Sequence, residues 1–507
     1  MNINESYDVI VVGYGFAGGA AAIAAADAGC KVLLLEKMAV PGGISIVSGG
    51  GIRLAKNYDE ALQYLDETCA GRTPKPCLEL IAKGMTELET YWRKLAEIND
   101  AELVFRDREG NYPFTGYQTF YYLDVESIPN FDPKTEYPHV RGRLGGPYVF
   151  KVIEDNVKAR PNIQVVTNAA VQQLIFQDEQ VSGVECVINH QRVTIQSKQG
   201  VILSCGGFEA NREMQKKYWK LDPIFSAANR GNTGDGIKMA QSAGADLSHM
   251  WHFHGSYGFK HTDENFPYAL RVKRLPDWTP GSTPTDVKMA WILLDKQGER
   301  FMNECQPYVQ DTGARDFDHY DLINLDFPRI PAWLIFDEEA RKLYPMGQSV
   351  MNDPDFEPYE WSQDNFKEVD NGILQKAESL DELALLLNVP KERLAESLQQ
   401  WNQQCETGHD PQFSRPSGTM VPVKTPPFYV GQVWPVVNNT QGGPVHDEHQ
   451  RVLTPFGKPI PRLYVAGELG SIWSFLYLAG GNLSECFITG KCAGEHVASL
   501  PRLSQSH

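Results

Sequence analysis

The sequence predicts an α/β protein in which a doubly wound domain, built from both ends of the chain, is interrupted by an α+β domain. Three observations predict this. A strand, a glycine turn, an alanine-rich run and a second strand follow one another near the start, a composition shift begins at Trp251, and a strand with a glycine turn returns at 459–470. A chain of 507 residues is also too long for one hydrophobic core.

The first domain is predicted from its opening unit. Residues 8–12, DVIVV, form a short apolar run typical of a buried parallel strand. The run AAAIAAADAG is a strong helix former that ends at Gly29, and KVLLLE is the next strand. Together they make a strand–turn–helix–strand unit of the doubly wound kind. Further strands are expected at 163–171 and 200–207.

The interrupting domain is predicted from residues of a different character. Residues 251–280 are rich in aromatic residues and proline, and residues 378–406 place leucines at roughly helical spacing. We therefore assign residues 1–255 and 432–507 to the first domain and residues 256–431 to the second.

Composition and charge narrow the function classes. The hydrophobic content is 42%, and the formal net charge of −17 argues against a nucleic-acid surface and an anionic membrane face. Nine scattered cysteines without metal-type spacing are typical of reduced thiols, so we expect a cytoplasmic protein without a metal. The start has no signal-peptide pattern. The longest apolar stretch, Val9 to Leu35, is interrupted by charged residues, so no integral membrane segment is expected.

A glycine motif indicates dinucleotide binding. Gly13, Gly15 and Gly18 form GxGxxG directly after a strand and before a helix, where they permit a tight turn and close approach of a pyrophosphate. The phosphate is expected at the helix N-terminus. Glu36 closes the second strand, where an acidic side chain binds ribose hydroxyls.

A second glycine-rich loop favours FAD over NAD. Residues 42–51 follow Glu36 almost at once, and VAGELG and AGGN return late in the chain. FAD is the longer molecule, and more backbone must lie against its pyrophosphate and flavin.

These pieces resemble the fumarate reductase and 3-ketosteroid dehydrogenase superfamily of flavoproteins. The matching segments, in the order of that family, are VVGYGFAGG, EKMAVPGGISIVSGG, VILSCGGF, NTGDGIKMAQSAGA, DKQGERFMNE, QGGPVHDE, LYVAGELGS and AGGNLSECFITGKCAG. The resemblance implies a Rossmann-like FAD-binding domain of the GR2 type with a catalytic domain inserted into it. It implies FAD contacts at Gly13, Gly15, Ala17, Gly18, Glu36, Ser48, Gly49, Gly50, Val171, Gly467, Glu468, Asn482 and Leu483. Residues 41–51 lack the histidine that carries covalent flavin in respiratory members, so FAD is expected to be non-covalent.

The fumarate reductase branch fits less well. The resemblance implies an arginine proton donor five residues after the asparagine of the RFxNE motif, but this chain has Tyr308 there. Ser474 and Leu478 stand at two further positions where that branch has a histidine and an arginine. We therefore expect a substrate that is uncharged near the flavin, since a buried unpaired charge is costly.

The ketosteroid branch supplies the roles for two tyrosines. There, a tyrosine matching Tyr308 and a late tyrosine matching Tyr477 are catalytic, and a glycine matching Gly481 binds the substrate ketone through its N–H. The resemblance implies that Tyr477 and Gly481 hold a ketone oxygen. Tyr308 would take a proton, which needs a neighbour or a water path that draws its own proton away, because an ordinary tyrosine has a pKa of about 10.

Other positions leave the reaction open. The third tyrosine of Δ1-dehydrogenases has Phe131 as its best local match, with Tyr121 and Tyr122 nearby, and the serine of Δ4-(5α)-dehydrogenases corresponds to Ala479. His252 and His254 are interpreted as structural histidines, and Arg315 as an ordinary ion-paired arginine. The aromatic segment that begins at Trp251 lines an apolar pocket or packs in the core.

The sequence thus supports three functional hypotheses. The first is an FAD-dependent dehydrogenase of a ring ketone, most simply a 3-ketosteroid, acting on an apolar substrate with a diffusible electron acceptor or donor. The second is a soluble fumarate reductase-like enzyme that acts on an enone, an unsaturated acid or a smaller cyclic ketone. The third is an electron-transfer flavoprotein subunit that works only within a complex.

Overall fold

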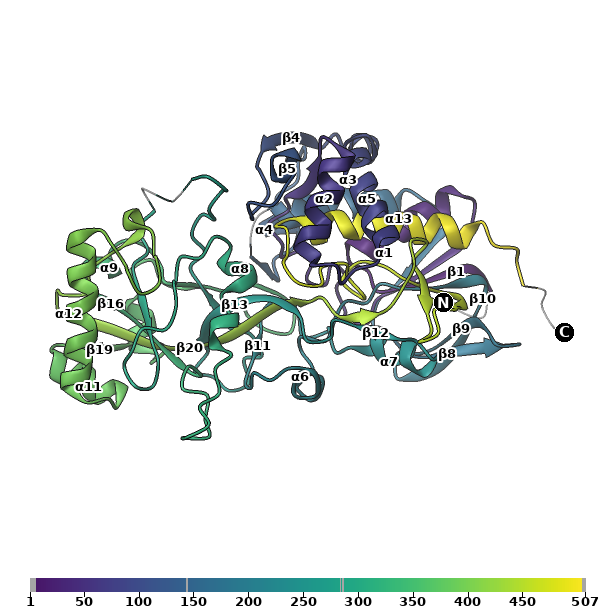
Figure 1. The fold of residues 1–507 in the computed structure, drawn as a ribbon. Coiled ribbons are helices and arrows are strands. Elements are labelled where there is room, and N and C mark those ends of the chain that lie inside the picture. The colour runs from purple at the N-terminus through teal and green to yellow at the C-terminus, as the bar shows by residue number, and fades with distance from the viewer. Residues whose placement is uncertain (1–5, 143–144, 283, 285–286, 504–507) are drawn as a thin grey trace.

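The computed structural model of the chain describes residues 6–142, 145–282, 284 and 287–503. Two large sheets dominate this part of the chain, and they lie in two bodies placed end to end (Figure 1). The first body holds the cofactor motif, and the second holds a sheet whose strands lie between Phe225 and Thr440.

The first sheet contains both ends of the chain. Its strands are β1 Tyr7–Val12, β2 Val32–Leu35, β7 Ile163–Val166, β8 Ala169–Gln177, β9 Gln180–Ile188, β10 Gln191–Leu203, β22 Arg451–Leu453 and β23 Pro459–Val465. The order is β22-β23-β10-β1-β2-β7, with β9 and β8 attached to β10 as an antiparallel extension. The run β23-β10-β1-β2-β7 is parallel, which confirms the predicted α/β fold class.

Helices cover one side of this sheet (Figure 1). They are α1 Phe16–Asp27, α2 Tyr58–Cys69, α3 Lys75–Ala96, α5 Gly145–Lys158 and α13 Gly481–Ala498. Small residues let α1 and α13 touch backbone to backbone. A Cβ atom on Gly490 or Gly494 of α13 would lie 2.4 Å from the carbonyl oxygen of Ala17 or Ala21. The helices α1 and α13, which come from the two ends of the chain, therefore pack closely against each other.

A small antiparallel sheet lies above the helices and contributes to the site. Its strands are β3 Ile52–Ala55, β4 Glu102–Asp107 and β5 Phe120–Ser127, in the order β3-β5-β4. The centre strand, β5, carries Tyr121 and Tyr122 on opposite faces, as successive residues of a strand must be.

The second sheet forms the core of the other body. Its strands are β11 Phe225–Ser226, β13 Phe253–Lys260, β14 Ala269–Val272, β15 Ile292–Leu294, β16 Ala332–Asp337, β17 Gly347–Gln348, β19 Gln375–Ala377 and β20 Phe428–Thr440. The order along the main path is β15-β16-β20-β13-β14-β17. The predicted boundaries at 255/256 and 431/432 fall inside β13 and β20, so this sheet includes residues on both sides of them. The division into domains stays a prediction.

The remaining elements are short or lie at the edges. They are α4 Pro133–Glu136, α6 Arg212–Tyr218, α7 Asp235–Ser242, α8 Val309–Thr312, α9 Glu338–Arg341, α10 Phe366–Asp370, α11 Leu380–Leu387, α12 Lys391–Thr407, the two-residue strands β6 Val140–Arg141, β12 Leu247–Ser248, β18 Met351–Asn352 and β21 Gly443–Pro444, and the 3₁₀ turns η1 Tyr117–Thr119, η2 Arg315–Phe317 and η3 Ser417–Thr419. Within the described ranges, none of the helices is long and apolar enough to cross a membrane.

Three predicted elements differ from the structure in instructive ways. The helical run at 378–406 is two helices, because Asn388 takes a left-handed conformation and Pro390 cannot continue a helix. The strand expected at 163–171 is divided between β7 and β8, with Asn168 at positive φ between them. The strand expected at 200–207 ends at Leu203, and residues 204–207 turn along the cofactor cleft.

Candidate active site

The glycine turn after β1 brings a helix N-terminus up to a cleft. Gly13 has a φ of +101°, and a Cβ atom there would lie 2.5 Å from the carbonyl oxygen of Ser204. A Cβ atom on Gly18 would lie 1.8 Å from the carbonyl oxygen of Gly13, so α1 packs on its own turn only because Gly18 has no side chain. Gly15 is the N-cap of α1 and lines the cleft. Backbone N–H groups of the first helical turn are good ligands for a phosphate.

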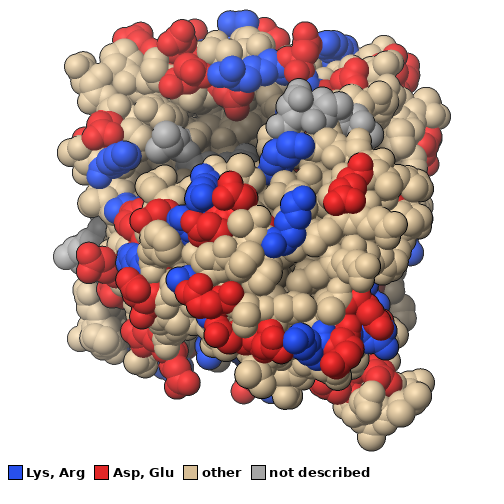
Figure 2. Space-filling view, turned by 90° about the vertical axis from the view of Figure 1, so that its left-hand side faces the viewer, with Lys and Arg blue, Asp and Glu red and all other residues tan. Residues whose placement is uncertain are grey.

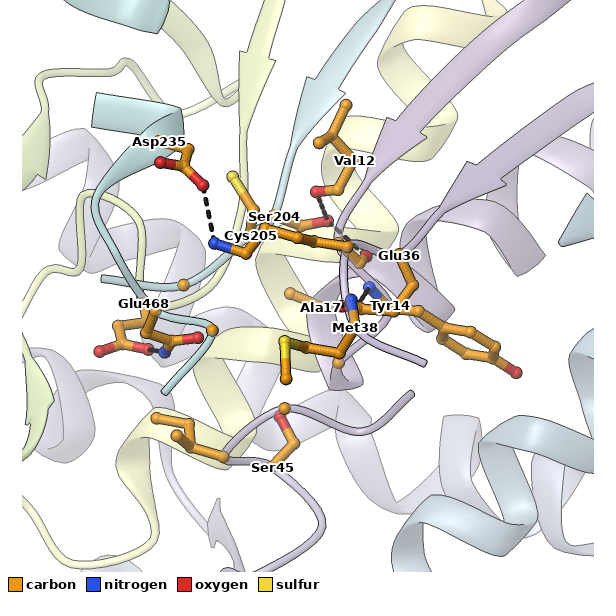
Figure 3. A pocket seen from close by; sticks show the side chains of 18 of the residues that line it. Val12, Tyr14, Ala17, Glu36, Met38, Ser45, Ser204, Cys205, Asp235 and Glu468 are labelled. Carbon is orange, nitrogen blue, oxygen red and sulfur yellow. Dashed lines mark hydrogen bonds and ion pairs between the residues drawn. The ribbon is translucent and has the colours of Figure 1, made fainter. Parts of the chain in front are cut away.

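Glu36 lines this cleft and fixes the backbone on either side of it. One carboxylate oxygen accepts a hydrogen bond from the Tyr14 N–H at 3.0 Å, and the other accepts one from the Met38 N–H at 2.8 Å. Burial raises the pKa of Glu36, and the two backbone N–H groups oppose that shift. Figure 3 shows Glu36 on one side of the cleft and Asp235 and Glu468 on the other. An acid so placed fits a ribose hydroxyl.

Most of the predicted FAD contacts line one of two cavities, and two glycines among them line neither. Gly13, Gly15, Ala17, Glu36, Val171 and Glu468 line the narrow cleft of Figure 3. Gly18 and Gly467 line neither cavity and instead allow close packing. A Cβ atom on Gly467 would lie 2.7 Å from that of Ala17.

A wider cavity of about 650 Å³ continues from the cleft. The two cavities adjoin, because they share the lining residues Phe16, Ile44, Ser45, Glu468 and Cys486. The remaining predicted cofactor residues line this second part, namely Ser48, Gly49, Gly50, Asn482 and Leu483. FAD is an elongated molecule. The narrow cleft, with the N-terminus of α1 and Glu36, and the wide cavity next to it together fit that shape. The buried Asn482 Oδ1 accepts no hydrogen bond from any described residue.

Tyr308 and His254 meet in the wide cavity. Tyr308 is the N-cap of α8, and His254 lies on β13. The Tyr308 hydroxyl lies 3.3 Å from Nε2 of His254, and Nδ1 of His254 lies 3.1 Å from Oδ1 of Asn439. An amide oxygen accepts only, so Nδ1 carries the proton and Nε2 accepts from Tyr308. The interpretation of His254 as purely structural is therefore replaced, because His254 is the neighbour that Tyr308 needs.

Burial sets the protonation of this pair. Burial lowers the pKa of His254 to about 3, so its imidazole is neutral at physiological pH. Burial, with Tyr477 close by, raises the pKa of Tyr308 well above its usual value. The shared proton consequently lies on the phenol.

Tyr477 stands beside both residues at the start of α13. Its ring centroid lies 4.5 Å from that of His254 and 6.0 Å from that of Tyr308. Its hydroxyl oxygen accepts hydrogen bonds from the N–H groups of Gly480 at 3.1 Å and Asn482 at 3.4 Å. The hydroxyl proton remains to be donated.

Gly481 differs from its expected role. Its N–H donates to the carbonyl oxygen of Leu478 at 2.8 Å, so it is used within the turn and not directed at a substrate. A Cβ atom on Gly481 would lie 2.2 Å from the Trp473 ring, which is the physical reason for a glycine there. The predicted pair of donors from Tyr477 and Gly481 is therefore not formed in this structure.

The third tyrosine of the cavity is Tyr122. It lines the wide cavity, whereas Phe131 packs against Tyr137 and Tyr148 elsewhere. The Tyr122 hydroxyl donates to the carbonyl oxygen of Ala479 at 2.9 Å and accepts from the buried Arg53 at 2.7 Å. Tyr122 therefore supports the backbone just before α13.

Two residues that sequence reasoning did not single out hold the Tyr477 segment from the other side. The buried carboxylate of Asp311 accepts the N–H of Tyr477 at 3.0 Å, and Asn111 Oδ1 accepts the N–H of Ala479 at 2.9 Å. Asp311 comes three residues after Tyr308, one helical turn on, which was the signal available in the sequence.

His252 and Arg315 do not line the wide cavity. His252 Nδ1 contacts the Trp473 carbonyl oxygen at 2.8 Å, and Arg315 forms an ion pair with Asp311 at 3.5 Å. The predictions of a structural histidine and an ion-paired arginine agree with these contacts.

The substrate is expected to be uncharged near the flavin, but charged side chains line the wide cavity. Arg271 and Arg274 line it together with Asp277, and Cζ of Arg274 lies 6.0 Å from the centre of the Tyr308 ring. These charges come from β14 and the loop after it, a region that the motif comparison did not cover. The face drawn in Figure 2 is hollowed, and acidic and basic side chains lie around the hollow.

Glu468 lines both the cleft and the wide cavity, and the buried Glu209 lies next to it. Burial raises the pKa of Glu468 to about 8. Burial and the neighbouring Glu468 raise the pKa of Glu209 as well, and Asn232 donates to Glu209 at 2.6 Å. Burial and mutual repulsion thus both favour the protonated form of this pair.

The comparisons with known proteins agree with this geometry. A sequence model of a family described as an FAD binding domain matches residues 8–483. The 3-oxosteroid 1-dehydrogenase of Mycolicibacterium smegmatis is 25% identical, over 99% of this chain and 99% of its own length. The crystal structure of the 3-ketosteroid Δ1-dehydrogenase of Sterolibacterium denitrificans has a TM-score of 0.78 at 24% identity, covers 97% of this chain and 99% of that chain, and so shows the same fold.

Reductases match as well. The NADH:acrylate oxidoreductase of Vibrio harveyi is 28% identical over 98% of this chain but only 51% of its own length. The chain thus spans about half the length of that relative. The expected cofactor, FAD, and the expected mixed α/β flavoprotein fold are both confirmed.

Proposed function

The chain belongs to the FAD binding domain family, within the fumarate reductase and succinate dehydrogenase superfamily of FAD-dependent oxidoreductases, and from this we propose that it transfers hydrogen across a carbon–carbon bond conjugated to a carbonyl group. FAD, held without a covalent bond, supplies hydride exchange at one of the two carbons. The protein has to move a proton at the other carbon and to polarise the carbonyl.

Tyr308 moves the proton in this proposal. In reduction of a C=C bond, the Tyr308 O–H gives its proton to the carbon next to the carbonyl. In the reverse direction, the Tyr308 oxygen takes a proton from that carbon as its own proton passes to Nε2 of His254. Because the raised pKa of Tyr308 and the lowered pKa of His254 keep the proton on the phenol, we propose that the chain is loaded for reduction.

Tyr477 polarises the carbonyl. Its oxygen already accepts two backbone N–H groups at the N-terminus of α13, so its hydroxyl proton is the part left to donate. Hydrogen bonds that an oxygen accepts strengthen the bond that its proton donates. The Tyr477 hydroxyl therefore donates to the carbonyl oxygen in place of the predicted pair of donors.

One observation carries the proposal: the 3.3 Å contact between Tyr308 and His254 in a cavity that shares its walls with the cofactor cleft. It supplies a proton donor, its partner and a route to the cofactor in one space. A relative named as an acrylate oxidoreductase supports the reductive direction.

The second candidate is dehydrogenation of a ring ketone, with a 3-ketosteroid as the simplest case. The match of Tyr308 and Tyr477 to that branch favours it, as does the 3-oxosteroid 1-dehydrogenase relative. Arg274 beside Tyr308 favours the reduction of an enone or an unsaturated acid instead.

Anaerobic spectroscopy of the bound flavin separates the two. For the holoprotein reduced with dithionite, we expect reoxidation by cyclohex-2-enone or an unsaturated acid on the time scale that a stopped-flow experiment resolves. Bleaching of the oxidised holoprotein by a saturated 3-ketosteroid, without reoxidation by any enone, would establish the second candidate. No response to any carbonyl compound, with turnover only by an artificial acceptor, would support an electron-transfer subunit.

A further inference from the structure

We infer that the substrate carries a carboxylate, which Arg274 and Arg108 bind beside Asp277 while the reacting bond lies at Tyr308. The inference rests on the proposed function and names the substrate class for the same cavity. It concerns residues of the loop after β14 and the end of β4, which the family motifs do not include.

Two guanidinium groups share one carboxylate in this wall. Arg274 Nη2 lies 2.6 Å from Oδ2 of Asp277, and Arg108 Nη2 lies 3.6 Å from the same oxygen. The Asp277 side chain is only 4% exposed, whereas those of Arg274 and Arg108 are 20% and 36% exposed and both line the cavity. Two positive charges against one negative charge leave an excess of one at this place.

Three further charged residues of the cavity wall, Arg106, Asp107 and Asp124, are paired with opposite charges. Arg106 forms ion pairs with Asp124 at 3.1 Å and with Glu126, and Asp107 pairs with Lys56 at 2.9 Å. Arg106 thus has two carboxylate partners, whereas Arg274 and Arg108 share one, in a chain whose formal net charge is −17.

The positive charge of Arg274 lies close to the proposed proton donor, Tyr308. Arg274 Cζ lies 6.0 Å from the centre of the Tyr308 ring, so a group bound by Arg274 lies beside the carbon that Tyr308 serves. Among the described residues, the Arg274 guanidinium donates a hydrogen bond to Asp277 alone. A guanidinium has five N–H donors in a fork that matches a carboxylate, which leaves donors for a second one.

An acid is the ligand that this arrangement recognises best. A carboxylate that enters a closed cavity loses its hydration and needs a cation with hydrogen bonds in return. The acid is either the conjugated carbonyl group itself, as in an unsaturated acid, or a separate group on an enone. Both place a carboxylate on Arg274, and the experiment below tells them apart.

The experiment measures binding before turnover. Cyclohex-1-ene-1-carboxylate and its carboxamide are titrated into the oxidised holoprotein, and binding is followed by the shift of the flavin absorbance. We expect the acid to bind at least tenfold more tightly than the amide in the wild type. Arg274→Gln should weaken acid binding by about 10- to 100-fold and leave amide binding within about threefold.

Two further variants keep the test specific. Arg274→Lys retains the charge but not the fork, so acid binding should recover in part. Arg106→Gln also removes an arginine from the cavity wall, but its charge is compensated by Asp124 and Glu126, so acid binding should change less than threefold. The flavin spectrum and the melting temperature of each variant report whether the fold and the cofactor are retained.

The outcomes separate this inference from the proposed function. Equal binding of acid and amide by the wild type, or equal losses in Arg274→Gln and Arg106→Gln, would overturn the carboxylate site. If reduced flavin is reoxidised by cyclohex-2-enone but not by the acids, the function stands and the inference falls. Reoxidation by cyclohex-1-ene-1-carboxylate assigns the acid as the conjugated group, and reoxidation only by 3-oxocyclohex-1-ene-1-carboxylate assigns it as a separate group. Tight binding of the acids without reoxidation by any carbonyl compound would refute the function and leave the site.

Discussion

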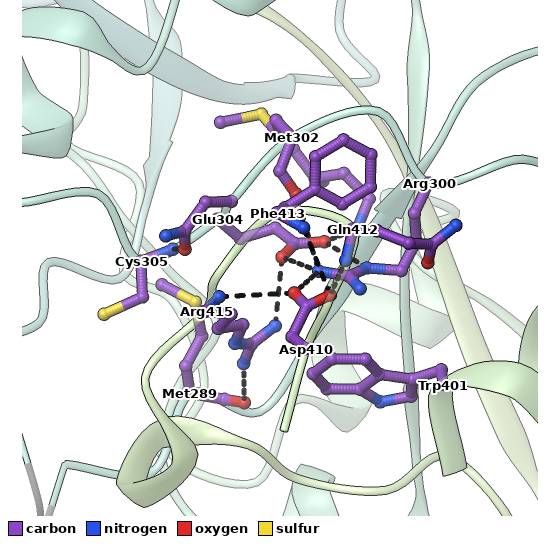
Figure 4. Close-up of polar contacts among 12 residues, drawn as sticks. Met289, Arg300, Met302, Glu304, Cys305, Trp401, Asp410, Gln412, Phe413 and Arg415 are labelled. Carbon is purple, nitrogen blue, oxygen red and sulfur yellow. Dashed lines mark hydrogen bonds and ion pairs between the residues drawn. The ribbon is translucent and has the colours of Figure 1, made fainter. Parts of the chain in front are cut away.

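One segment, residues 300–308, supplies two buried polar clusters that differ in how fully their groups are paired. The first cluster closes on itself. Arg300 contacts Glu304 at 2.9 Å and Asp410 at 3.2 Å, and Arg415 contacts Glu304 at 3.2 Å (Figure 4). Arg415 also donates to the carbonyl oxygens of Trp291 and Met289 at 2.9 and 2.8 Å. The side chains of these four ionic residues are at most 3% exposed.

The second cluster begins four residues after Glu304 and stays open. The Tyr308 hydroxyl has His254 as its partner at 3.3 Å, the Tyr477 hydroxyl keeps a proton to donate, and Arg274 keeps donors beyond Asp277. The comparison teaches that burial alone does not mark a functional site. The closed network holds the loops in place, and the open cluster is the one that a ligand completes.

Breaking the closed network should have the largest effect on stability. Glu304→Ala leaves Arg300 and Arg415 without their shared carboxylate, so we expect a loss of about 3–5 kcal/mol in the free energy of unfolding. Burial alone would raise the pKa of Glu304, but Arg300 and Arg415 lower it, which shows how strongly they hold its charge. Urea denaturation measures the loss.

An exposed ion pair provides the control for Glu304. Glu185 pairs with Arg192 at 2.9 Å on the surface, and Glu185→Ala should change the unfolding free energy by less than about 1 kcal/mol. Similar losses in the two variants would mean that the buried network is no more important than a surface pair.

Opening the second cluster should affect the rate and not the fold. Tyr308→Phe removes the proton donor and keeps the ring, so we expect flavin reoxidation to slow by about 10²- to 10⁴-fold with FAD still bound. Stopped-flow absorbance measures the rate. Tyr257→Phe removes a buried hydroxyl whose partner is Trp291 at 3.1 Å, away from the cavity, and should react at the wild-type rate. A Tyr308→Phe enzyme at full rate would require another proton donor.

Tyr477→Phe should have a somewhat smaller effect. It removes one donor to the carbonyl oxygen and leaves the N–H groups of Gly480 and Asn482 without their acceptor. We expect a loss of about 2–4 kcal/mol in transition-state stabilisation, measured as kcat/KM for the enone. Unchanged turnover would remove Tyr477 from the mechanism.

The sequence predicted the fold and the cofactor well because their signals are local. Gly13, Gly18 and Glu36 lie within one strand–helix–strand unit, so spacing alone indicates their roles. The break between α11 and α12 was missed although Pro390 signals it, and the break at Asn168 was missed because an asparagine at positive φ has no strong sequence signature. The sequence did not predict that β13 and β20 extend across the predicted domain boundaries, because strand pairing is a long-range contact.

The active site was predicted only in part, for the same physical reason. Tyr308 and Tyr477 carry recognisable motifs, but His254, Arg274 and Asp311 join them only when distant strands and loops come together. The resemblance to the ketosteroid branch predicts that the Gly481 N–H donates to a substrate ketone. That N–H is used by Leu478, a contact that depends on the exact turn before α13.

His254 offers the finest test of the comparison, because a buried neutral histidine leaves a mark on the pH dependence of stability. Burial lowers the pKa of His254 to about 3 in the folded protein, whereas an unfolded histidine titrates near 6.5. Between these values the unfolded chain binds one more proton than the folded chain, so stability falls as the pH drops below about 6.5. His254→Asn removes this contribution. From pH 7 to pH 5, the wild type should therefore lose about 2 kcal/mol more unfolding free energy than the variant, measured by urea denaturation at both pH values. Equal losses would mean that His254 titrates in the folded protein as it does in the unfolded chain, and His254 would then not be the buried neutral partner of Tyr308.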